Sequence, residues 1–216
     1  MSVEQLRLAV YRGFADTGRA PSDQELAAIL GVSELTVRSG LWTLHEQRHI
    51  VLRDEAIVMA HPFSAVPLGF SVMGSRTLWW GGCAWDSFAI PHLVGEEVLV
   101  ATRCPGCERA LAWNVGTEQP PKGDEVAHFL VPITTLWDDV VHACGNQRLF
   151  CDEGCVAGWL ARTGQRRGYF LDLTTLWRLA EHWYEGRLHR GYERRDPATA
   201  AAYFASVGLE GRFWGL

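Results

Sequence analysis

The stretch Gly-Gly-Cys-Ala-Trp-Asp, residues 81–86, places a thiol and a carboxylate three residues apart. Residues three apart on a helix share one face, so a helix that begins at Cys83 would direct Cys83 and Asp86 toward one substrate. A thiol at a helix start lies near unpaired N–H groups and the positive end of the helix dipole, which favour the thiolate. Gly81 and Gly82 carry no side chains and leave room beside the sulfur. We therefore predict a thiolate of lowered pKa at Cys83, with Asp86 as an acid beside it.

All the cysteines lie in the C-terminal two thirds of the chain: Cys83, Cys104, Cys107, Cys144, Cys151 and Cys155. The N-terminal segment carries Glu4 and does not have the pattern of a secretory signal, so we expect a cytoplasmic protein with reduced thiols. In that compartment, clustered cysteines indicate metal binding or catalysis more often than disulfides.

The cysteines other than Cys83 allow an alternative interpretation. Cys104-x2-Cys107 together with Cys151-x3-Cys155 has the spacing of a four-cysteine zinc site. Such a site would use Cys151 as a zinc ligand and withdraw it from any catalytic role. Cys144 is expected to be a loop or core cysteine without a function.

Length and composition indicate a globular protein. The chain has 216 residues, of which 48% are hydrophobic, enough for one large domain or for a small domain and a medium one. Its formal net charge of −5 gives no general attraction to nucleic acid or to anionic membranes. No apolar run reaches the length that spans a bilayer.

Residues 1–60 have the pattern of a winged helix. Ser22 followed by Glu25 is a capping box for a helix, Ser33 caps a second helix, and residues 50–60 have the pattern of a β-hairpin. This pattern suggests DNA binding. The charge argues against it, because the segment contains six arginines and eight acidic residues. We therefore interpret it as a packing domain and do not expect nucleic acid as a partner.

Residues 61–70 contain two prolines and a glycine and are interpreted as a linker. Residues 71–216 are interpreted as the catalytic domain. Strand and helix patterns mix there without regular alternation, which predicts an α+β fold with an antiparallel-rich sheet. Two of the expected strands, in residues 96–104 and 109–116, are joined by the Cys104–Cys107 turn.

Several of these residues together resemble the organomercurial lyases, also called alkylmercury lyases. The resemblance rests on His-Pro-Phe-Ser-Ala-Val-Pro (residues 61–67), on the Cys-Ala-Trp-Asp tetrapeptide, on Cys104, and on Leu-Phe-Cys ending at Cys151. It covers roughly residues 61–175, and the winged-helix pattern agrees with the architecture of that family. The family cleaves carbon–mercury bonds by protonolysis, with two cysteines and an aspartate. The resemblance assigns these roles to Cys83, Cys151 and Asp86 and makes Cys104 structural.

The implied chemistry suits these residue types. Mercury(II) is a soft ion that prefers thiolate ligands, and a neighbouring carboxylic acid can protonate the departing carbon. The products would be a hydrocarbon and Hg²⁺ held by Cys83, Cys151 and Asp86. The resemblance implies no cofactor, but it does imply reduced cysteines, external low-molecular-weight thiols for product release, and a mercuric reductase as acceptor. Two other functions are left open: a zinc-stabilised winged-helix regulator and a non-catalytic metal-binding protein.

Overall fold

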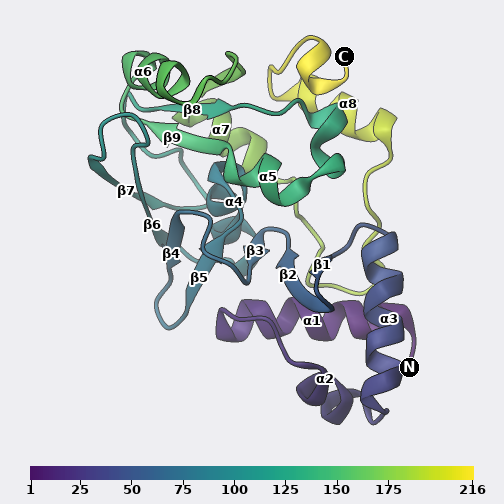
Figure 1. The fold of residues 1–216 in the computed structure, drawn as a ribbon. Coiled ribbons are helices and arrows are strands. Elements are labelled where there is room, and N and C mark those ends of the chain that lie inside the picture. The colour runs from purple at the N-terminus through teal and green to yellow at the C-terminus, as the bar shows by residue number, and fades with distance from the viewer.

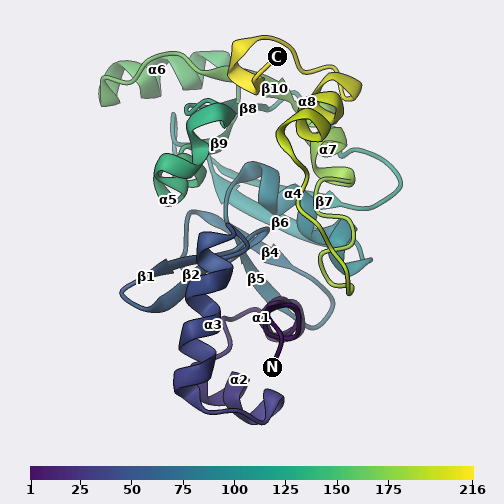
Figure 2. The same ribbon diagram turned by 90° about the vertical axis from the view of Figure 1, so that its right-hand side faces the viewer.

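The computed structural model describes residues 1–216, and three helices form the N-terminal end of the molecule (Figures 1 and 2). Ser22 and Ser33 each accept a hydrogen bond from a backbone N–H three residues later, and Ser22 forms the expected capping box with Glu25. The predicted starts of the second and third helices are therefore confirmed. The helices are α1 (Val3–Thr17), α2 (Asp23–Leu30) and α3 (Glu34–Glu46).

The predicted hairpin is present as β1 (Val51–Arg53) and β2 (Ala56–Ala60). Asp54 and Glu55, at its turn, have φ angles of 50° and 64°, the left-handed conformation that tight hairpin turns favour. The hairpin forms one edge of a seven-stranded antiparallel sheet of order β1-β2-β3-β5-β4-β6-β7. The other strands are β3 (Phe63–Ser64), β4 (Phe70–Met73), β5 (Leu78–Gly81), β6 (Val98–Arg103) and β7 (Ala110–Val115).

The segment expected to be a linker, residues 61–70, is built into this sheet. Phe63 pairs with Gly81 of β5, and Ser64 pairs with both Met59 of β2 and Trp80 of β5. Phe63 and Ser64 are fully buried. The prolines therefore shape a short buried strand, and one hydrophobic core includes residues on both sides of it. The division into a unit of residues 1–60 and a unit of residues 71–216 stays a prediction, as does the winged-helix interpretation.

Helix α4 (Ala84–Val94) passes through the middle of the molecule. It contacts strands β4 and β5 of the large sheet and also helix α7 (Leu173–Glu181). Every residue from Ala84 to Pro91 is buried. Since the helix is covered on all sides, any group at its N-terminus is held in a fixed position by the core.

A smaller antiparallel sheet of order β10-β8-β9 lies at the end of the molecule away from α2 (Figure 1). Its strands are β8 (Val126–Phe129), β9 (Gln147–Phe150) and β10 (Tyr169–Asp172). Mixed helices and antiparallel sheets confirm the predicted α+β class. None of the helices is long and apolar enough to cross a membrane. The remaining elements are η1 (Ile133–Asp138), α5 (Val140–Gly145), α6 (Glu153–Thr163), α8 (Pro197–Ser206) and η2 (Arg212–Trp214).

Gly18 ends α1 at the point where this helix meets the large sheet. Its φ is 74°, and an added Cβ would lie 2.0 Å from the carbonyl oxygen of Leu78. Gly31 ends α2 with a similar φ of 65° but has no atom within 4 Å of such a Cβ. Gly31→Ala should therefore cost about 1 kcal/mol, for the left-handed conformation alone.

Gly18→Ala should lower the free energy of unfolding by about 1–3 kcal/mol more than Gly31→Ala does. The additional loss arises because α1 must also move away from β5. Denaturant titration of the two variants checks this difference. Equal losses would show that the contact between α1 and β5 is loose.

Candidate active site

Cys83 lies at the N-terminus of α4, directly after strand β5, as the sequence predicts. Its sulfur accepts a hydrogen bond from the backbone N–H of Asp86 at 3.3 Å, and its carbonyl oxygen accepts one from the Ser87 hydroxyl at 2.6 Å. An added Cβ at Gly82 would lie 2.3 Å from Oδ2 of Asp86, and one at Gly81 would lie 2.0 Å from Oγ of Ser87. The two glycines therefore make room for Asp86 and Ser87.

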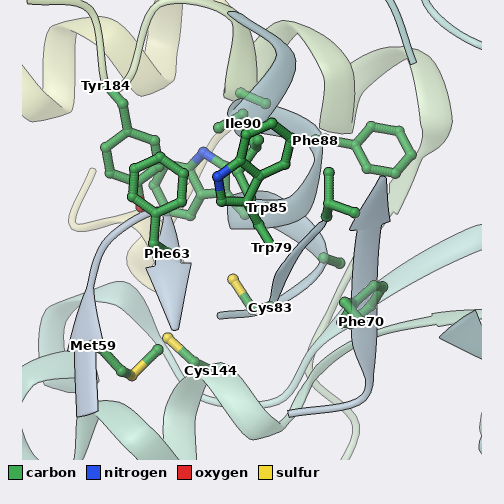
Figure 3. Packing of buried hydrophobic residues seen from close by; sticks show 14 of the residues in the cluster. Met59, Phe63, Phe70, Trp79, Cys83, Trp85, Phe88, Ile90, Cys144 and Tyr184 are labelled. Atoms are coloured by element: carbon green, nitrogen blue, oxygen red, sulfur yellow. The ribbon is translucent and has the colours of Figure 1, made fainter. Parts of the chain in front are cut away.

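The second thiol beside Cys83 belongs to Cys144, near the end of α5. Both cysteines are buried, and Figure 3 shows their side chains next to each other, near Met59. The Cys144 thiol also lies 4.0 Å from Oδ2 of Asp86. Asp139 fixes the start of α5 by accepting a hydrogen bond from the backbone N–H of His142. This short helix brings Cys144 to the N-terminus of α4.

Asp86 is 1% exposed and has polar partners on both carboxylate oxygens. The Tyr184 hydroxyl donates to Oδ1. Nδ1 of His61 lies 3.1 Å from Oδ2, the oxygen that also faces Cys144. Nε2 of His61 is buried without a hydrogen-bond partner. A buried carboxylate is costly unless it is hydrogen-bonded, so these partners keep Asp86 at the thiols.

The thiols do not have the lowered pKa that the helix start suggests. Burial is the largest cause that raises the pKa of Cys83 well above its ordinary value, and the hydrogen bond with Cys144 and the charge of Asp86 add to it. The hydrogen bond with Cys83 lowers the pKa of Cys144, but burial and Asp86 raise it by more. Both cysteines are therefore neutral thiols at neutral pH. The predicted resting thiolate is wrong because desolvation outweighs the helix dipole.

A cavity of about 540 Å³ opens onto the two thiols and Asp86. Aromatic side chains form much of its wall, and Figure 3 shows Trp85 and Tyr184 above Cys83. Apart from Asp86, the charged side chains that line the cavity are arginines: Arg48, Arg187, Arg194 and Arg195. The site thus combines an apolar space, two soft ligand atoms and a carboxylate.

Cys151, which the sequence analysis paired with Cys83, does not line this cavity. It follows β9, a strand of four residues that spans about 13 Å and begins shortly after Cys144. Its sulfur lies 3.4 Å from that of Cys107, in a group with Cys104 and Cys155. The structure thus brings together Cys83 and Asp86 but not Cys151, and it puts Cys144 in the place expected for Cys151.

Three site residues, Cys144, His61 and Tyr184, were not predicted from the sequence, although a signal existed for Cys144. If the two cysteine pairs are taken as one group of four, Cys144 is the only cysteine left to accompany Cys83. His61 stands in a stretch that supported the resemblance, but nothing in its spacing points to Asp86. Tyr184 is 98 residues away from its partner Asp86 and lies in an ordinary aromatic segment.

Comparison with known proteins found one family model and a similar solved structure. The family model for alkylmercury lyase, MerB, matches residues 63–185, a range that contains Cys83, Asp86, Cys144 and Tyr184. The fold is similar to that in the crystal structure of the mercury-bound form of MerB2, with a TM-score of 0.61 and 17% sequence identity, over 81% of this chain and 87% of that one. No curated protein matches the sequence. The match to the family model extends over more than half of the sequence, and the chain belongs to the alkylmercury lyase family.

Proposed function

We propose that Cys83, Cys144 and Asp86 carry out the cleavage of carbon–mercury bonds that defines this family. The observation that supports this most directly is the meeting of two thiols and one carboxylate at a single cavity. This proposal replaces Cys151 by Cys144 and keeps the other two roles predicted from the sequence. A regulator or a non-catalytic metal-binding protein would not need a carboxylate buried against two neutral thiols.

In the first step, the organomercurial enters the cavity and mercury binds one thiol and then the other. Soft thiolate ligands suit soft metal ions, so each sulfur gives up its proton as it binds. The neighbouring positions of the two thiols and the 4.0 Å approach of Cys144 to Asp86 place the carboxylate where it can accept such a proton. Two electron-donating sulfurs on mercury weaken its bond to carbon.

In the second step, Asp86 passes the proton to the carbon as the carbon–mercury bond breaks. The bond's electron pair stays with carbon and forms the new C–H bond, and mercury remains Hg²⁺ on two thiolates. Overall, RHg⁺ and two thiols give RH, a mercury bis-thiolate and one H⁺, with no change of oxidation state. Tyr184 and His61 hold the carboxylate in position during this transfer.

The cavity wall supports an apolar organic group. Trp85, Trp137, Trp183 and Phe204 line the space that opens onto the thiols. Aromatic surfaces bind alkyl and aryl groups by excluding water, and a dry site also strengthens the electrostatic interactions of Asp86.

Product release requires other thiols. Hg²⁺ held by two buried sulfurs leaves when low-molecular-weight thiols replace Cys83 and Cys144, and a mercuric reductase would be the final acceptor. Arginines at the cavity suit thiols that carry carboxylates. Neutral, reduced cysteines also fit a cytoplasmic location, where thiols stay reduced.

The direct test of the function is to incubate the reduced protein with a phenylmercury salt and excess thiol. The formation of benzene, measured by gas chromatography, should exceed that in buffer and thiol alone. A protein that takes up the mercury compound but releases no benzene would be a mercury binder and no lyase.

Cys83→Ser and Cys144→Ser should each reduce benzene formation to the rate of buffer and thiol alone. A single thiolate neither weakens the carbon–mercury bond sufficiently nor holds the product, and serine is a poor ligand for soft mercury. Cys151→Ser removes a thiol that lies outside the cavity, and the folded fraction of this variant should keep kcat/KM within about tenfold of the parent, a change below roughly 1.4 kcal/mol in the barrier. Circular dichroism checks that each variant is folded. If Cys151→Ser lost benzene formation and Cys144→Ser kept it, the pairing of Cys83 with Cys151 expected from the sequence would be restored.

Asp86→Asn should still bind Hg²⁺ through Cys83 and Cys144 but lose cleavage. The amide is close to the carboxylate in shape yet cannot deliver a proton, and general acid catalysis contributes about two to four orders of magnitude. Mercury binding is followed by the thiolate–mercury absorption band and cleavage by benzene formation, measured separately. A variant that cleaves at nearly the parent rate would leave Asp86 as a structural carboxylate at the start of α4.

A further inference from the structure

The four cysteines outside the active site form a compact group. The sulfur atoms of Cys104, Cys107, Cys151 and Cys155 all lie within 4.8 Å of one another. They come from two turns of the chain: the β6–β7 turn supplies the first pair, and the junction of β9 with α6 supplies the second. Cys104 is buried, Cys151 and Cys155 are half-buried, and Cys107 is exposed.

These distances are those of a tetrahedral thiolate site. Zinc–sulfur bonds of about 2.3 Å in a tetrahedron put the sulfur atoms ~3.8 Å apart. The Cys107–Cys151 distance is 3.4 Å, and the other sulfur pairs lie inside the 4.8 Å limit. Only small side-chain movements would give four equal bonds. Two close cysteine pairs, each within one turn, are also the usual sequence pattern of structural zinc sites.

The backbone around these cysteines is arranged to support negatively charged sulfur. The backbone N–H of Cys151 donates to the sulfur of Cys104 at 3.5 Å. The turn itself is closed by a hydrogen bond from the Glu108 N–H to the Cys104 carbonyl oxygen at 2.9 Å. Donors of this kind stabilise thiolates, as metal ligands require.

Two further contacts hold the turn against α6. Gly106 packs so closely that an added Cβ would lie 2.5 Å from the carbonyl oxygen of Cys155. The guanidinium of Arg162, in α6, donates to the carbonyl oxygens of Pro105 and Gly106 at 2.9 and 3.0 Å. Its charge, with that of Arg109, offsets part of the net charge of −2 that four thiolates and one divalent ion would carry.

We propose that Cys104, Cys107, Cys151 and Cys155 bind one Zn²⁺ as a structural site separate from the mercury site. Binding converts four thiols into thiolates, forms four zinc–sulfur bonds and releases four protons to solvent, with no change of oxidation state. The ion joins the β6–β7 turn to the β9–α6 junction. In this way it fixes the end of β9 that lies away from Cys144.

The test is the metal content of the full chain, purified under reducing conditions without chelators. Elemental analysis should give one zinc per chain. Replacement of zinc by Co²⁺ should give the visible absorption of tetrahedral cobalt together with a strong thiolate charge-transfer band. Removal of zinc by a chelator should lower the midpoint of thermal unfolding, because binding energy at such sites stabilises the folded state.

Variants separate this site from the active site. Cys155→Ala should lose the stoichiometric zinc, whereas Cys155→His should retain it, because histidine also binds zinc well. Cys83→Ser with Cys144→Ser is the matched control, since it removes two buried thiols but none of the four ligands, and it should keep one zinc.

Several outcomes would overturn the proposal: protein that contains no zinc and gives no tetrahedral cobalt spectrum, an iron cluster in its place, or a Cys107–Cys151 disulfide in the reduced preparation. So would zinc that disappears in the double active-site variant and survives in Cys155→Ala. The zinc content of the parent chain and of Cys155→Ala concerns cysteines that the lyase mechanism does not use, so benzene formation by the parent protein tests the proposed function independently of the zinc site.

Discussion

The burial of Asp86 is the constraint on which the active site depends. A carboxylate in the core is costly unless each oxygen has polar partners, and here those partners come from distant parts of the chain. Tyr184 follows α7, His61 precedes β3, and Cys144 lies near the end of α5. The docking of these segments around one helix start therefore assembles the thiols and the acid at the same time. The site is a product of tertiary packing and is not contained in the Cys-x-x-Asp motif.

The raised pKa values of the two thiols fit a reaction that consumes a proton at carbon. A helix N-terminus favours a charge by only about 0.3–1 kcal/mol, whereas full burial disfavours the charged form more strongly. Burial therefore dominates and raises the pKa of Cys83 and of Cys144, and in the proposed mechanism both thiols keep their protons until mercury binds. The proton that carbon requires is then released inside the cavity, next to Asp86. A pair of resting thiolates would bind mercury as well but would bring no proton.

Local signals in the sequence predicted much of the fold. Capping serines and a hairpin pattern fix element boundaries through contacts within a few residues, so these boundaries could be read directly. The short strand within residues 61–70 was not predicted, because proline and glycine are common both in linkers and beside short buried strands. His61 and Tyr184 were missed for a different reason. Their roles depend on which distant segments pack together, and no spacing in the sequence records that.

The two groups of cysteines also show how one chain can direct the same chemical group to different uses. Strand β9 separates them, with Cys144 before it and Cys151 after it. On one side, two thiols are enclosed with a carboxylate in an aromatic cavity that admits an apolar ligand. On the other, four sulfurs meet at a tight turn, and the backbone N–H of Cys151 donates to one of them, an arrangement that suits a small cation with four thiolate ligands. The ligand is thus selected by the space and the donors around the sulfur atoms. For this reason the short distance between Cys144 and Asp86 is stronger evidence for the location of the active site than the number of cysteines in the sequence.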